Sequence, residues 1–125
     1  MVDIDDKSFE RLTREALASL TGVHAKNISN IAIIYADIPS NEQRRQLKLR
    51  DDQTLFGLYE GVPLPFRQGQ TKLIPDKITL FKLPLSQASA DIEQLKENIR
   101  HTLWHEIGHY YGLDHDRIHE LESNN

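Results

Sequence analysis

The segment HEIGHYYGLDH, residues 105–115, holds three histidines and one glutamate. On a helix, His105 and His109 share one face because they are four residues apart, with about 6 Å of rise between them. Their imidazoles can therefore hold one metal ion at about 2.0 Å from each nitrogen. Glu106 lies about 100° further round the helix, too far to be an equivalent ligand but able to reach a water on that ion. This H-E-x-x-H spacing predicts two metal ligands and a general base.

A third ligand is expected just after this helix. Gly112 tolerates the left-handed backbone conformation that often ends helices, so the chain can turn back there. His115 follows this turn and is predicted to be the third ligand. Its neighbour Asp114 faces the opposite way in an extended segment, and is predicted to bond a backbone amide or a histidine nitrogen beside the site. His119 is expected on a short helix over residues 116–122, pointing elsewhere.

The absence of cysteine narrows the chemistry of the predicted site. Disulfides and thiolate metal sites are excluded, so any metal must be held by His, Asp or Glu. Histidine ligands suit zinc, and one ion per chain is expected. Three protein ligands leave a fourth position open for water, as in catalytic zinc sites. Zinc strongly lowers the pKa of its water, to about 7, and Glu106 is predicted to take the proton as the water attacks.

Other residues near the motif have structural rather than chemical interpretations. Trp104 and Tyr110 are expected to pack in the core. Gly108 lies inside the predicted helix, where glycine costs about 1 kcal/mol relative to alanine, so the close approach of another element is expected there. His24 and His101 are expected to be solvated residues that take no part in the site.

Three helices are predicted before the C-terminal segment. The motif ends a long helix over residues 89–111, whose apolar residues form one stripe at helical spacing: Ile92, Leu95, Ile99, Leu103, Ile107 and Tyr110. An opening helix is predicted over residues 5–22, with Gly22 as its end. A short polar helix over residues 40–51 would be capped by Ser40.

The intervening segments predict strands and one loop. Residues 27–39 are apolar at successive positions and predict a strand buried on both faces. Residues 54–61 and 77–85 predict two more strands, the second ended by Pro84, and the proline-rich residues 62–76 predict a loop. Helices that flank a run of strands indicate an α+β domain, with the helices packed against one small sheet.

The length and the net charge of the chain limit the number of domains and the classes of function that are expected. The chain has 125 residues, which suits a single domain over residues 1–125. A formal net charge of −4 argues against a large nucleic-acid surface. The first residues lack the apolar run of a signal peptide, and no apolar stretch reaches the ~20 residues of a membrane span. A cytoplasmic location is therefore expected.

Two resemblances to zinc peptidases follow from these residues. HEIGHYYGLDH matches the H-E-x-x-H-x-x-G-x-x-H signature of metzincins, but the chain is far shorter than a usual metzincin domain and its only methionine is Met1. LFGLYEGVPLPFR, PDKITLFKLPL and HEIGHYYGLDHDRIHEL together resemble a small bacterial family of zincin-like metallopeptidases, whose members often carry Asp where this chain has His115. The resemblance implies a minimal zincin with a small mixed sheet, an N-terminal helix and a C-terminal active-site helix. It also implies His105, His109 and His115 as zinc ligands, Glu106 as base, and a peptide or protein substrate.

Three alternatives stay open at this point. The histidine spacing is also similar to that of bacterial metal-dependent endoribonucleases of ribosomal-RNA maturation, although that family has Gly in place of Glu106. A zinc ion could instead only stabilise a non-catalytic module that binds a peptide or partner. The gluzincin arrangement, with a distant glutamate ligand, fits poorly because only Glu120 and Glu122 follow the motif.

Overall fold

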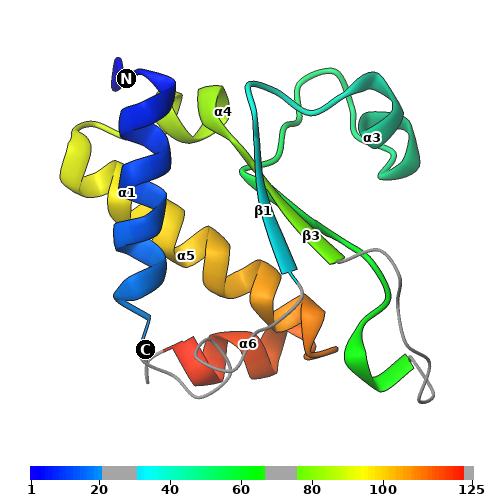
Figure 1. Ribbon diagram of the computed structural model, residues 1–125. Helices are drawn as coiled ribbons and strands as arrows, with labels where there is room; N and C mark the ends of the chain where they lie inside the picture. The colour runs from blue at the N-terminus through cyan, green and yellow to red at the C-terminus, as the bar shows by residue number, and fades with distance from the viewer. Residues whose placement is uncertain (21–30, 67–75, 123–125) are drawn as a thin grey trace.

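The computed structural model describes residues 1–20, 31–66 and 76–122. It has the predicted α+β architecture: a three-stranded mixed sheet packed against the N-terminal and the long C-terminal helix (Figure 1). The elements are α1 Asp6–Ala18, β1 Ile31–Ala36, α3 Asn41–Gln46, β2 Gly57–Glu60, the 3₁₀ helix η1 Leu64–Phe66, β3 Asp76–Phe81, α4 Lys82–Gln87, α5 Ile92–Tyr110 and α6 His115–Glu122. The opening helix ends at Ala18, with Ser19 as its C-cap, so it stops before Gly22, which was predicted as its end. The predictions for His24 and for the start of the first strand lie outside the described residues.

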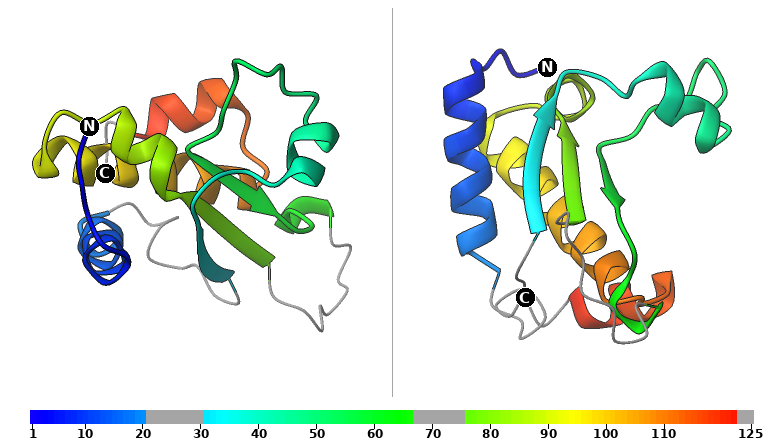
Figure 2. Two further views of the ribbon diagram at one scale, coloured as in Figure 1. Left: turned by 90° about the horizontal axis from the view of Figure 1, so that it is seen from above. Right: turned by 45° about the vertical axis from the view of Figure 1, so that its right-hand side comes forward.

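The sheet has the strand order β1–β3–β2. β3 is central and pairs in parallel with β1, from Ile31 opposite Asp76, and antiparallel with β2, from Gly57 opposite Leu80. β1 and β2 are therefore the two edges of the sheet. α5 runs beneath the sheet and contacts both β2 and β3, so its C-terminal half comes close to the β2 edge (Figure 2).

The core lies between the sheet, α1 and α5. Its fully or nearly buried side chains include Phe9, Leu12, Ala16, Leu20, Ile78, Leu80, Leu85, Leu95, Ile99, Leu103, Trp104, Ile107 and Ile118. The apolar stripe predicted for the long helix is thus buried, with one exception. Ile92 is 47% exposed because α5 begins at this residue, where the Asp91 side chain caps it by accepting from Gln94 N–H at 2.8 Å. The predicted start at residue 89 was three residues early.

Two strand predictions need correction. β1 is not buried on both faces: Ile31, Ile33 and Tyr35 pack against the core, whereas Ile34 points the other way and is 39% exposed. Apolar residues on both faces do not ensure burial of both when helices cover one face only. The segment 77–85 is a strand only to Phe81 and continues as α4.

Pro84 lies inside α4 rather than ending a strand. It is the third residue of that helix, in the first turn, where a backbone N–H has no acceptor within the helix. Proline is tolerated there, so the sequence LPL permits a helix start as well as a strand end. The predicted strand over 54–61 is shorter than expected, and the predicted loop over 62–76 contains η1.

The short polar helix is α3, and Ser40 caps it as predicted. Ser40 Oγ accepts from Gln43 N–H at 3.0 Å, and Gln43 Oε1 accepts from Ser40 N–H at 2.8 Å, which completes a capping box. Within the described residues, no helix is both long enough and apolar enough to cross a membrane.

Candidate metal centre

The C-terminal half of α5 carries both a buried and an open face. Trp104, Ile107 and Tyr110 are buried in the core, as predicted for the first and last of these. His105 and His109 are half-buried on the neighbouring face, one turn apart. The amphipathic pattern of the helix therefore fixes the direction in which this histidine pair points.

α5 ends in a hydrogen-bonding pattern that requires Gly112. Gly112 has a φ of +75°, Leu113 N–H donates to Gly108 C=O at 3.0 Å, and Gly112 N–H donates to His109 C=O at 3.0 Å. This is the Schellman motif, with glycine at the left-handed position. The glycine also admits a neighbour, since a Cβ on Gly112 would lie 2.8 Å from Cγ of Pro65 in η1.

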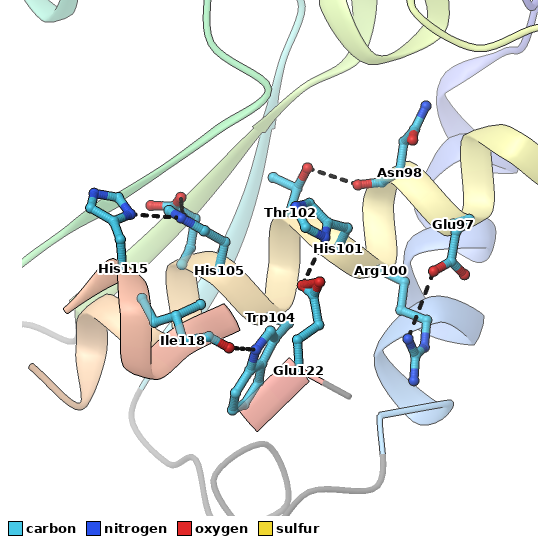
Figure 3. Close-up of polar contacts among 11 residues, drawn as sticks. Glu97, Asn98, Arg100, His101, Thr102, Trp104, His105, His115, Ile118 and Glu122 are labelled. Atoms are coloured by element: carbon cyan, nitrogen blue, oxygen red, sulfur yellow. Dashed lines mark hydrogen bonds and ion pairs between the residues drawn. The ribbon is translucent and has the colours of Figure 1, made fainter. Parts of the chain in front are cut away.

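After this turn, α6 folds back along α5 and brings His115 to the site (Figure 3). Asp114 caps α6 by accepting from Arg117 N–H at 2.8 Å, so His115 is the first residue of the helix. The helix begins one residue earlier than predicted. Asp114 does bond a backbone amide, but from a helix cap rather than from an extended segment.

Contacts of Ile118 with Trp104 and Gly108 help to hold α6 against α5. Trp104 Nε1 donates to Ile118 C=O at 3.0 Å, and the fully buried Ile118 side chain packs on Gly108. A Cβ at Gly108 would lie 2.5 Å from Ile118 Cγ1, so the predicted close approach at this glycine is confirmed. The sequence thus keeps a glycine inside α5 because a neighbouring helix occupies the space of its side chain.

His105, His109 and His115 converge in the folded chain. Each offers a ring nitrogen, and these nitrogens all lie within 4.8 Å of one another. His105 Nε2 and His115 Nδ1 are 3.1 Å apart, and the ring centroids are separated by 4.9, 5.0 and 5.5 Å. Tetrahedral nitrogen ligands at about 2.0 Å from zinc are about 3.3 Å apart. The set is therefore close to a three-histidine zinc site, the donor type that zinc accepts.

Glu106 is next to the triad but is turned into the protein. It is 8% exposed, and its Oε1 accepts a hydrogen bond from the backbone N–H of Tyr59 in β2 at 2.8 Å. Its Oε2 lies 3.4 Å from His105 Nδ1. The Tyr59 contact could not be predicted from the sequence, because it joins a backbone group and a side chain that are 47 positions apart in the chain.

The environment shifts the pKa values of His105 and His109 in opposite directions. The hydrogen bond to Glu106 raises the pKa of His105 above its usual value. Partial burial lowers the pKa of His109, and the neighbouring histidines lower it further. A low pKa favours the neutral imidazole, which is the form that binds metal.

The two other histidines of the described region, His101 and His119, lie outside the triad. His101 is half-exposed, but its Nδ1 lies 2.7 Å from Glu122 Oε2, so it is not simply solvated (Figure 3). His119 is exposed, and its ring centroid lies 6.3 Å from that of His105. The His101–Glu122 contact, which joins α5 to α6, was missed because each residue alone is typical of a helix surface.

Comparison with protein families decides the relationship. A model of the zincin-like metallopeptidase family matches residues 28–125, which is most of the chain and includes all the residues of the triad. The chain belongs to this family. A comparison with curated proteins gives no match. The resemblance to zincin-like metallopeptidases is thus confirmed over most of the sequence.

In this member of the family the triad opens into a cleft of about 720 Å³. One side of it is formed by His105, Glu106, His109 and His115, and another by Gly57, Leu58 and Tyr59 of β2 together with Gly61, which follows the strand. The cleft therefore places an edge strand, a carboxylate and three potential metal ligands around one space. A substrate that entered it would meet all three.

Proposed function

We propose that this zincin-like metallopeptidase hydrolyses peptide bonds with one zinc ion per chain, held by His105, His109 and His115, and with Glu106 as general base. The observation that carries the proposal is the convergence of three imidazole nitrogens beside the Glu106 carboxylate in an open cleft. When bound, zinc would acidify a water and polarise the scissile carbonyl. Three protein ligands suit a catalytic site because they leave a coordination position free.

Glu106 would act through its Oε2 atom. The Tyr59 N–H donates to Oε1 at 2.8 Å, whereas Oε2 has only the longer contact of 3.4 Å with His105 Nδ1, so Oε2 is the oxygen that we assign to proton exchange. Oε2 would take a proton from the attacking water and pass it to the leaving amine. The backbone of β2 is thereby a positioning group, which contacts the base and not the reacting atoms.

An extended peptide is the substrate that fits the neighbourhood of the site. Peptides can pair with an exposed sheet edge, and β2 is an edge that lines the cleft. Of the two segments that could have supplied this edge, residues 77–85 are excluded because β3 is central. Family membership favours a peptide over RNA, as does Glu106, which the similar endoribonucleases lack.

The test compares the parent with Glu106→Gln. Glutamine keeps an oxygen for the Tyr59 N–H but cannot serve as a base, so the variant should bind zinc normally. We expect its cleavage of unstructured peptides to fall at least about 100-fold, the low end for loss of a general base. The same pair is assayed on single-stranded RNA. Cleavage of RNA alone that persists in Glu106→Gln but is lost in His105→Ala would favour the endoribonuclease. Zinc binding without either activity would favour the non-catalytic module.

A further inference from the structure

The walls of the cleft are apolar. Besides the histidines, Glu106 and Tyr59, the side chains of the described residues that line it carry no ionisable group. The apolar members come from four separate segments of the chain: Leu47, Leu55, Leu58, Pro63, Phe66 and Leu113. A charged substrate side chain would therefore lose water there without gaining a partner of opposite charge among them.

Two of the apolar side chains that line the cleft are exposed to solvent. Phe66 is 67% exposed and Leu47 is 44% exposed. Exposed apolar surface costs about 25 cal/mol per Å² relative to burial, so a ligand that covers it gains free energy. Single exposed apolar residues are common, but here two flank a cleft that contains the proposed catalytic groups.

The backbone fixes both of these side chains beside the metal centre. Phe66 follows Pro65, which packs on Gly112 at the end of α5, so η1 is attached to the same turn that positions the third histidine. Phe66 N–H also donates to Pro63 C=O at 2.9 Å. The contact of Pro65 with Gly112 therefore places the backbone next to Phe66 beside the turn that leads to His115.

Leu47 is held by the end of α3. The next residue, Lys48, has a φ of +55°, and Leu49 N–H donates to Arg44 C=O at 3.0 Å, which closes the helix end. Gln43 Nε2 donates to Glu60 Oε1 at 3.1 Å and ties α3 to β2. Leu47 is thus carried by an element bonded to the edge strand of the cleft.

We infer that the cleft selects peptides with a bulky apolar side chain, of the leucine or phenylalanine class, next to the scissile bond, with Leu47 and Phe66 as specificity-determining residues. This inference rests on the proposed function. The occupant is argued from the continuity of the apolar wall with the triad: a chain whose carbonyl lies at the histidines would place a neighbouring side chain against that wall.

The experiment uses a set of peptides that differ at one position, with Gly, Ala, Leu, Phe, Asp or Lys beside a common cleavage site. With the zinc-loaded parent, kcat/KM for Leu or Phe should exceed that for Gly, Asp or Lys at least tenfold, the lower range for filling an apolar pocket. Phe66→Ala and Leu47→Ala should reduce this ratio toward one. Leu83→Ala, at an exposed leucine of α4, is the matched control and should change nothing.

Binding is measured separately, so that failure of the proposed function can be distinguished. Glu106→Gln, loaded with zinc, is titrated with the same peptides, and Phe66→Ala in that background should lose the preference for Leu and Phe. If no peptide is cleaved but this preference holds, the proposed hydrolysis is wrong and the apolar specificity stands. Equal binding of all six peptides, or tighter binding of Asp or Lys, overturns the inference. A parent dimer that Phe66→Ala converts to a monomer would also overturn it, by assigning the wall to a second copy.

Discussion

α5 and α6 carry histidines at the same four-residue spacing, yet they support them in different ways. α5 is a 19-residue helix whose apolar face is buried, and His105 and His109 occupy the flank of that face. α6 has 8 residues, one of them buried, and presents His115 in its exposed first turn. The pair is supported by the core, whereas the third histidine depends on a cap, a turn and one buried side chain.

The positions of the three histidines are therefore determined in two different ways. The distance between His105 and His109 follows from helix geometry, and it holds wherever α5 is helical. The position of His115 depends on how α6 docks, through the turn at Gly112 and the contact of Ile118 with Gly108. Changes on α5 should therefore remove the site, and changes on α6 should loosen it.

The largest effect is expected for His105→Ala or His109→Ala. Each leaves only one histidine of the pair, so neither variant should retain zinc near one ion per chain after dialysis. Metal analysis of the folded variants checks this, with circular dichroism to show that α5 persists. His119→Ala is the control, because His119 lies outside the triad, and it should keep its zinc. Stoichiometric zinc in both α5 variants would remove the basis for the site.

His115→Ala should weaken the site without abolishing it. The α5 pair remains, so zinc should still bind, but more than about 100-fold more weakly, beyond the 10–100-fold typical of losing a residue that only orients a ligand. Competition with a chelator measures this affinity. His115→Asp should bind much more tightly than His115→Ala, since a carboxylate oxygen also ligates zinc. Equal affinities of His115→Ala and the parent would show that the pair alone holds the ion.

Ile118→Ala tests the docking of α6 without touching a ligand. Loss of a fully buried isoleucine should lower the free energy of unfolding by about 2–5 kcal/mol, measured by urea denaturation. Zinc affinity should fall, but less than in His115→Ala, because all three histidines remain. Leu83→Ala, at an exposed position, should alter neither quantity. Unchanged zinc affinity in a clearly destabilised Ile118→Ala would mean that docking of α6 does not position His115.

The same contrast explains what the sequence could predict. The geometry of residues 105–109 could be predicted, because the apolar stripe indicates a helix and the four-residue spacing of His105 and His109 places them on one face of it. Gly112 and Gly108 were also interpretable, since glycine in these positions indicates a left-handed turn or a close approach. These local signals were sufficient for the α+β class and for the place of the motif, and they predicted the order of helices and strands except for α4, which lies partly in the segment 77–85 predicted as a strand.

Features that depend on distant partners could not be predicted. The hydrogen bond from Tyr59 N–H to Glu106 involves a backbone group, which carries no sequence signal. The exposed face of β1 at Ile34 depends on which face of the sheet the helices cover. Proline lacks a backbone N–H, so whether the chain can be helical at Pro84 depends on whether this residue lies in the first turn of a helix. In each case the neighbouring residues allowed two structures, and tertiary packing decided between them.

Asp114 offers the smallest and most specific test, because it acts on His115 through the start of α6. Its carboxylate accepts from Arg117 N–H at 2.8 Å, and loss of such a cap typically costs about 0.5–2 kcal/mol. Asp114→Ala should therefore fray the first turn of α6, where His115 lies, and weaken zinc binding about 10-fold, less than His115→Ala does. The affinity is measured with the same chelator competition.

Asp114→Ser and Asp114→Asn separate capping from a charge effect. Both side chains can accept from the Arg117 N–H, so both should restore most of the zinc affinity if Asp114 acts as a cap. If the carboxylate instead supports a histidine through its charge, neither neutral residue should restore it. A weaker site in Asp114→Ala than in His115→Ala would move the third ligand from residue 115 to residue 114. The dependence on α6 would then remain, but the cap and the ligand would be the same residue.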